Sequence, residues 1–260
     1  MDLGISGRMA FICASSQGLG LACATSLAKE GVHVVLNGRD AGKLEAASAA
    51  LRADVPGAEV EVLAADLTTA EGRAAILAAH PQVDILVTNN AGPPPGALED
   101  WDELALIAAM QANMIPAAQL IRAHVPGMKA RGFGRIVNIT SAMVKAPHYM
   151  MGLSTAARAA LTALSKAVSR DTVASNVTIN NLLPERIDTP RQDFMAKRRM
   201  ALDGITYEEA RAKAAETIAA KRFGRPEEFG DACAYLCSAQ AGFISGQNLQ
   251  LDGGSYEGLV

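Results

Sequence analysis

The chain has 260 residues, 50% of them hydrophobic, and a formal net charge of −3. This composition supplies a large apolar core and excludes an intrinsically disordered protein. The absence of any run of lysines or arginines argues against a nucleic-acid or anionic-membrane partner. We expect no transmembrane helix, because no apolar stretch of about 18 residues is apparent. The N-terminus does not resemble a signal peptide, and the four cysteines match no zinc pattern. We therefore expect a cytoplasmic protein without a metal site.

Short β-branched runs alternate with longer Ala- and Leu-rich stretches along the whole chain. The expected strands are 9–13, 32–37, 60–64, 85–88, 135–139, 178–182 and 248–251. The expected helices are 20–30, 41–52, 71–79, 101–131, 152–174 and 226–238. Strand–helix alternation predicts parallel pairing, and nearly continuous apolar strands predict a sheet covered on both faces. The sequence thus predicts an α/β fold, a Rossmann-type, doubly wound sheet of seven parallel strands, in a single domain over residues 1–260.

Residues 190–224 interrupt this alternation with charged, helical sequence. Two helices are expected, 190–201 and 206–221, separated by the Asp203–Gly204 pair. An insertion that follows the C-terminal end of a strand lies on the ligand side of such a sheet. The segment is either a substrate lid or a solvated helix pair, and the sequence does not decide between them.

The turn after the first strand has the composition of a phosphate-binding loop. Such a turn places a dinucleotide pyrophosphate against the amides at a helix N-terminus. Glycines at positions 18 and 20 allow close backbone approach, since they carry no Cβ. The loop predicts a dinucleotide site formed by Ala14, Ser16, Gln17, Gly18, Leu19 and Gly20.

The end of the second strand indicates which dinucleotide is bound. An acid near this point would hold the ribose hydroxyls of NAD. The sequence has Gly38 instead, followed by Arg39, whose guanidinium suits a 2′-phosphate. We therefore expect NADP(H) in preference to NAD(H), with a plain surface cation as the alternative role of Arg39.

The order and spacing of these segments resemble the short-chain dehydrogenase/reductase family from about residue 5 to 256. The loop resembles the family's T-G-x-x-x-G-x-G, with Cys13 and Ala14 at the first two positions. The chain is most similar to the branch of 3-oxoacyl-carrier-protein-reductase-like proteins. The resemblance implies that Asp66 faces the adenine and that Thr189 faces the nicotinamide amide or the phosphates. It adds to the cofactor site the residues Asp66, Leu67, Asn90, Ala91, Gly92, Arg158, Pro184 and Thr189.

The same resemblance locates the catalytic residues and reveals two replacements. The family uses an asparagine, a serine, a tyrosine and a lysine, and Asn113 and Ser141 occupy the first two positions. Ser154 stands at the tyrosine position, thirteen residues after Ser141, and Arg158 stands at the lysine position. An aliphatic hydroxyl is a far weaker acid than a phenol, whose pKa is about 10. Arginine stays protonated, although its N–H groups can still hold ribose hydroxyls.

A substitute proton donor is therefore needed. Tyr149 is the first candidate, with Arg158 to stabilise its anion, although Tyr149 also suits a role as a wall of the substrate pocket. We expect an NADP-dependent oxidoreductase acting on a small carbonyl, alcohol or acyl-thioester substrate. The alternative is a catalytically degenerate nucleotide-binding protein that acts as a sensor or partner. The resemblance also implies a homotetramer or dimer.

Overall fold

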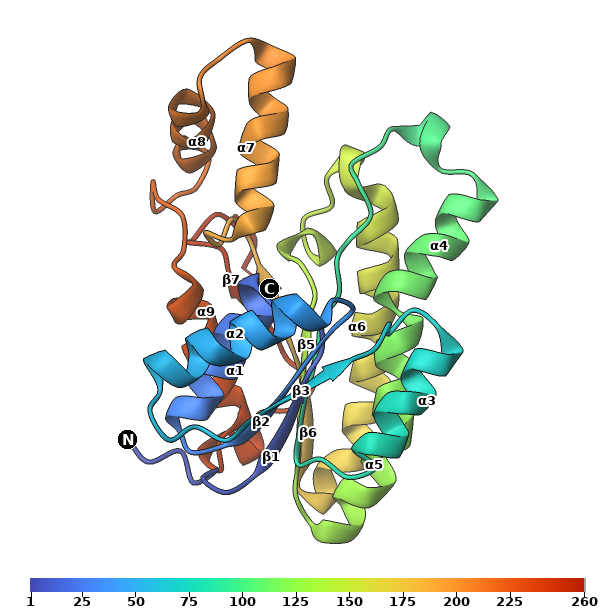
Figure 1. The fold of residues 1–260 in the computed structure, drawn as a ribbon. Coiled ribbons are helices and arrows are strands. Elements are labelled where there is room, and N and C mark those ends of the chain that lie inside the picture. Colours follow the sequence, from blue (N-terminus) through green and yellow to red (C-terminus); the bar gives the residue numbers. More distant parts are fainter. Residues whose placement is uncertain (260) are drawn as a thin grey trace.

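A computed structural model describes residues 1–259 and contains one seven-stranded sheet in the order β3-β2-β1-β4-β5-β6-β7 (Figure 1). Every pair of neighbouring strands is parallel. The predicted Rossmann-type sheet is therefore confirmed. The strands are β1 Met9–Ile12, β2 His33–Gly38, β3 Val60–Ala64, β4 Ile85–Thr88, β5 Gly134–Ile139, β6 Val177–Pro184 and β7 Asn248–Leu251.

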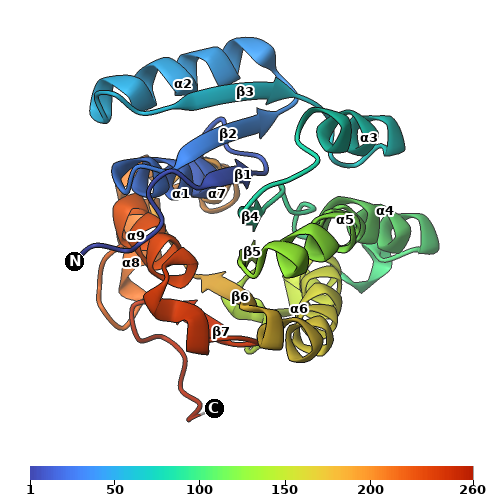
Figure 2. The ribbon, with the colours of Figure 1, turned by 90° about the horizontal axis from the view of Figure 1, so that it is seen from below.

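Helices cover both faces of the sheet, as Figure 2 shows from below. One face carries α1 Gly18–Lys29, α2 Ala41–Asp54 and α9 Pro226–Cys237. The other carries α3 Ala70–Ala79, α5 Ile115–Arg131 and α6 Gly152–Thr172. Strand β1 supplies both cores because alternate side chains point to opposite faces: Ala10 and Ile12 join the first cluster and Phe11 the second.

The single helix expected over 101–131 is wrong. The structure has α4 Glu103–Asn113 and then α5 Ile115–Arg131, with Met114 between them at φ −124° and ψ −55°. Pro116 lies in the first turn of α5, where its missing N–H is tolerated, and its ring is incompatible with an uninterrupted preceding turn. The break ends α4 at Asn113, one of the predicted site residues.

The expectation that no apolar stretch reaches the length of a membrane span is also wrong. Within Glu103–Arg131, an 18-residue window has a mean hydropathy of 1.5, and 28% of that window is buried. The hydropathy value reflects length and composition alone. Met114 interrupts the helix between Glu103 and Arg131. Within this segment the exposed large hydrophobic side chains lie on α4, at Leu104, Leu106 and Ile107.

The segment after β6 forms two helices at the C-terminal end of the sheet, α7 Pro190–Asp203 and α8 Tyr207–Glu216 (Figure 1). Gly204 separates them at φ +64°, as expected, but the second helix ends five residues earlier than predicted. Arg211 on α8 contacts Asp188 at 2.8 Å and packs 4.4 Å from the centre of the Phe223 ring. These contacts fix α8 to the start of α7.

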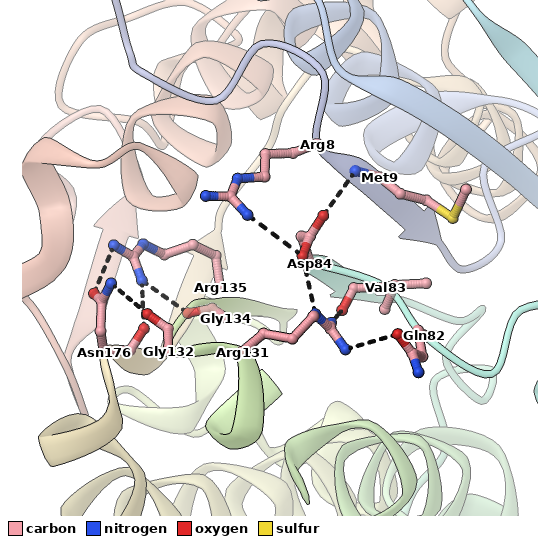
Figure 3. Close-up of polar contacts among 10 residues, drawn as sticks. All are labelled: Arg8, Met9, Gln82, Val83, Asp84, Arg131, Gly132, Gly134, Arg135 and Asn176. Carbon is pink, nitrogen blue, oxygen red and sulfur yellow. Dashed lines mark hydrogen bonds and ion pairs between the residues drawn. The ribbon is translucent and has the colours of Figure 1, made fainter. Parts of the chain in front are cut away.

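A buried arginine stands at the opposite end of the sheet (Figure 3). Arg135 on β5 is 1% exposed and donates hydrogen bonds to the backbone carbonyls of Gly134, Asn176 and Ser238 and to the Asn176 side chain. Burial lowers its pKa. Its guanidinium thus ties β5 to the turns before β6 and after α9, well away from the ligand edge.

Candidate cofactor and active site

The turn between β1 and α1 has the geometry of a phosphate cradle. Ala14 lies at φ +47°, in the left-handed region that favours glycine, and its carbonyl accepts a hydrogen bond from the Asn89 side chain at 3.2 Å. A Cβ on Gly20 would lie 2.6 Å from the Ala14 carbonyl oxygen, so only glycine fits there. The Gln17 side chain does not cap α1. The first amides of α1 therefore point outward without a side-chain acceptor, which suits a bound phosphate.

Gly18 and Thr189 face each other across this turn. A Cβ on Gly18 would lie 3.7 Å from the Thr189 Cβ, and the Thr189 hydroxyl donates to the Ile187 carbonyl at 3.3 Å. Pro184 ends β6 beside them. A hollow of about 480 Å³ opens next to the turn, between α1 and the starts of α7 and α9. The turn and Thr189, both predicted to hold the cofactor, therefore lie together.

Arg39 and Asp66 occupy the other end of the cofactor groove. Arg39 is exposed immediately after β2, and within residues 1–259 no carboxylate oxygen lies within 4.0 Å of it. Hydrogen bonds from Thr68 lower the pKa of Asp66, and the charge of Arg39 lowers it further. Leu67 is buried beneath this pair. Arg39 therefore has free donors for a phosphate.

The end of β4 is joined to the end of α4 by two reciprocal hydrogen bonds. The Asn90 side chain donates to the Ala112 carbonyl at 2.8 Å, and the Asn113 side chain donates to the Ala91 carbonyl at 3.1 Å. Asn113 is buried. These bonds hold the segment up to Gly92 against the helix that delivers Asn113, as the predicted site requires.

Ser154 and Arg158 lie together on the inner face of α6. One guanidinium nitrogen donates to the Ser154 hydroxyl at 2.5 Å, and the other donates to the Asn90 carbonyl at 3.4 Å. A Cβ on Gly92 would lie 3.0 Å from the Arg158 Nη1, so the missing side chain makes room for the guanidinium. Burial, followed by the charge of Arg191, lowers the pKa of Arg158 to about 10. Arg158 therefore stays cationic at neutral pH.

A small cavity of about 20 Å³ lies beneath Arg158. Its polar lining includes Asn90, Asn113 and Arg158, and its apolar lining includes Leu120 and Leu161. A cavity of this size with several polar partners has room for about one water. Such a water would connect the asparagine to the guanidinium.

The structure separates Tyr149 from these groups. Ser141 begins a 3₁₀ turn at the end of β5, where its hydroxyl accepts from the Met143 amide at 3.2 Å. Tyr149 is 58% exposed; its hydroxyl accepts from the Leu98 amide at 3.1 Å, and its ring packs against Trp101. Among residues 1–259, no hydrogen bond joins Tyr149 to Ser141, Ser154 or Arg158. Its role as proton donor stays a prediction.

Glu185 is a further titratable group, which sequence reasoning did not include among the site residues. It follows β6, lies partly buried 3.4 Å from the Arg186 guanidinium, and its amide donates to the Leu251 carbonyl. Desolvation raises its pKa, against the opposing charges of Arg186 and then His148. A carboxyl group directly after a buried strand was the signal that would have found it.

No group of three or more histidine, cysteine or acidic side chains in the described part of the chain is arranged to hold a metal ion. All four cysteines are free and buried. Burial is the main reason that the pKa of Cys13 rises to about 12.

Known proteins resemble the chain over nearly its whole length. A family model described as enoyl-(acyl carrier protein) reductase matches residues 13–256. The NADPH-dependent reductase BacG of Bacillus subtilis is 31% identical, covering 98% of this chain and 100% of its own. Dehydrogenase/reductase SDR family member 4 of Bos taurus is 32% identical, covering 98% and 89%.

Solved structures extend this likeness to three dimensions. L-sorbose reductase from Gluconobacter frateurii, complexed with NADPH and L-sorbose, has a TM-score of 0.93 at 32% identity and full coverage of both chains. A 3-oxoacyl (acyl-carrier-protein) reductase from Agrobacterium tumefaciens with NADP bound has a TM-score of 0.86 at 32% identity, covering 97% and 96%. These matches show that the chain belongs to the short-chain dehydrogenase/reductase family.

Proposed function

We propose that the protein is an NADPH-dependent reductase of a small carbonyl compound, in which Arg158 replaces the family's lysine and Ser154 its tyrosine. The observation that carries the proposal is the cationic Arg158, which is joined to Ser154 and to the Asn90 carbonyl beside the nucleotide cradle. The relatives that act with NADPH and the NADPH-bound neighbours support the cofactor.

Different residues of the chain bind the cofactor and orient the substrate. When bound, the reduced nicotinamide supplies a hydride that, with one proton, converts a ketone to an alcohol and leaves NADP⁺. The amides of the first turn of α1 hold the pyrophosphate, and Arg39 holds the 2′-phosphate. Arg158 retains unused N–H donors that can hold ribose hydroxyls and stabilise negative charge developing on the carbonyl oxygen. Ser141 orients that oxygen.

The proton has two candidate sources. Tyr149 and Glu185 both lie on segments that follow the C-terminal ends of strands, where ligands bind in open α/β sheets. The raised pKa of Glu185 favours its protonated form, which can donate. The Tyr149 hydroxyl is held by the Leu98 amide. Among residues 1–259, no hydrogen bond joins either group to Ser154 or Arg158, so variants must decide between them.

Two variants separate these sources. If Glu185 supplies the proton, Glu185→Gln lowers kcat by about 10²-fold, because a positioned acid contributes about 10²–10⁴-fold. In the parent protein, kcat should fall as pH rises through the pKa of Glu185, since the acid must be protonated to donate. In Glu185→Gln, this fall of kcat at higher pH should disappear. Steady-state kinetics across the pH range in which the protein stays folded test this. Tyr149→Phe serves as the comparison, and a loss of about 10²-fold in that variant alone would assign the proton to Tyr149.

Arg39 sets the expected cofactor preference. Arg39→Gln should weaken NADPH binding by about 10-fold or more, because a hydrogen bond to a charged group contributes about 1.5–3 kcal/mol. NADH binding should stay the same, since NADH has no 2′-phosphate. Calorimetric titration of both cofactors measures the difference. The exposed Arg170 on α6 offers a matched control as Arg170→Gln, and equal loss for NADH would contradict the assignment.

The alternative is a nucleotide-binding sensor or partner protein, which the loss of the tyrosine supports. NADPH oxidation against a panel of ketones, sugars and 3-oxoacyl thioesters decides between the two functions. NADPH binding without turnover of any panel member would favour the sensor, and failure to bind either cofactor would overturn both.

Three further features are part of the proposal. The apolar segment of α4 and α5 suits a homotetramer or dimer interface. Helices α7 and α8 suit a substrate lid. A cytoplasmic location fits the free cysteines. Sedimentation at micromolar concentration tests the assembly.

A further inference from the structure

Basic side chains at the inner end of α7 lack acidic partners. Arg191 stands in the first turn of α7, directly after Thr189 and Pro190. Arg198 follows seven residues later, about two helical turns, and so lies on the same face. Within residues 1–259, neither forms an ion pair within 4.0 Å, and neither does Arg158. Three guanidinium groups near the cofactor turn are therefore uncompensated.

These three cations lie close enough to interact. The charge of Arg191 contributes to the lowered pKa of Arg158. Desolvation and then the charge of Arg198 lower the pKa of Arg191. The Arg191 guanidinium packs 5.4 Å from the centre of the Phe194 ring, which orients it on the surface of α7. Mutual repulsion among like charges is unfavourable until an anion arrives.

The nearby acids are committed elsewhere. Asp188 accepts from Arg211 at 2.8 Å, and Asp193 accepts from the Tyr207 hydroxyl at 2.6 Å. Both partners, Arg211 and Tyr207, lie on α8. Asp188 and Asp193 therefore bind α8 side chains and do not pair with Arg191. The whole chain has 27 acidic residues against 24 lysines and arginines. Within residues 1–259, Arg191 and Arg198 are therefore unpaired although the chain carries an excess of acids.

We propose that Arg191 and Arg198 bind a carboxylate of the substrate, with Arg158 adding positive potential at the inner end of the row. The substrate class is then a small oxo acid, whose ketone lies at the nicotinamide end and whose carboxylate lies along α7. The planar fork of arginine matches a carboxylate with two parallel hydrogen bonds. This inference rests on the proposed reductase function and names its substrate class.

A matched pair of substrates tests the inference. Acetoacetate and ethyl acetoacetate share a ketone and differ in the carboxylate. Arg191→Gln is expected to raise the KM for acetoacetate by about 10-fold or more, as loss of a charged hydrogen bond predicts. The KM for the ester and the Kd for NADPH should not change. Arg191→Lys should recover part of the loss, and Arg199→Gln is the control, since Arg199 pairs with Asp203.

A binding measurement keeps the test independent of turnover. Malonate, an unreactive dicarboxylate, is titrated calorimetrically into the protein with and without NADPH, and we expect binding that Arg191→Gln abolishes. A rise in the Kd for NADPH in that variant would assign Arg191 to the cofactor phosphates and overturn the inference. Absence of malonate binding to the parent protein would also overturn it. If neither ketone is reduced but malonate binds through Arg191, the reductase proposal fails and the anion site stands.

Discussion

Changing Ser154→Tyr and Arg158→Lys together is expected to raise kcat for ketone reduction by about 10²-fold or more, within the range that a positioned acid–base group contributes. The rest of the apparatus is in place: Ser141 follows β5, and Asn113 is held to the Ala91 carbonyl at 3.1 Å. A phenol at position 154 is a far stronger acid than the serine hydroxyl. The lysine would lower the pKa of that phenol. Single-turnover kinetics with saturating NADPH isolate the chemical step.

The single variants are the controls for this experiment. Ser154→Tyr alone places the phenol beside the Arg158 guanidinium, which now contacts the serine hydroxyl at 2.5 Å. Arg158→Lys alone has no phenol to activate and should not increase kcat. An unchanged rate in the double variant, with NADPH binding intact, would show that proton donation is not what limits the native site and would favour Glu185 or Tyr149 as an efficient donor.

Arg135→Met should lower the free energy of unfolding by about 3 kcal/mol or more. The guanidinium satisfies three buried backbone carbonyls and the Asn176 side chain, and a buried polar group left unpaired costs about 1–3 kcal/mol. Methionine fills a similar length without any donor. Urea unfolding followed by circular dichroism measures the change in midpoint.

Lys129→Met is the matched control for this variant. Lys129 pairs with Asp171 at 3.0 Å on the surface, and exposed ion pairs contribute about 0–1 kcal/mol. Arg135→Lys should fall between the two, because one ammonium cannot reach all four acceptors. NADPH binding should survive in each folded variant, since Arg135 lies at the start of β5, whereas the cradle follows the end of the parallel strand β1. A loss under about 1 kcal/mol for Arg135→Met would mean that water satisfies the carbonyls.

The site was predictable where its residues follow each other in the chain. The turn from Ala14 to Gly20 could be read from its glycines because the loop and the helix amides that hold a phosphate are local. Contacts between distant segments could not be read this way. The pairing of Arg158 with the Asn90 carbonyl joins residues 68 positions apart. The hydrogen bond from Leu98 to the Tyr149 hydroxyl, 51 positions apart, likewise depends on how two loops pack.

The sequence by itself determined the seven-stranded parallel architecture, since short β-branched runs alternate along it with longer Ala- and Leu-rich stretches. Through the family resemblance it also predicted that Ser154 and Arg158 replace two catalytic residues. The tertiary structure decided where the 101–131 segment breaks, because the break at Met114 depends on how α4 packs against α6 as well as on Pro116. The tertiary structure also decided which charges stay unpaired. Arg211 forms ion pairs with Asp188 and Asp193, so these acids do not pair with Arg191. Charge pairing is a property of spatial neighbours, and linear order does not specify those neighbours.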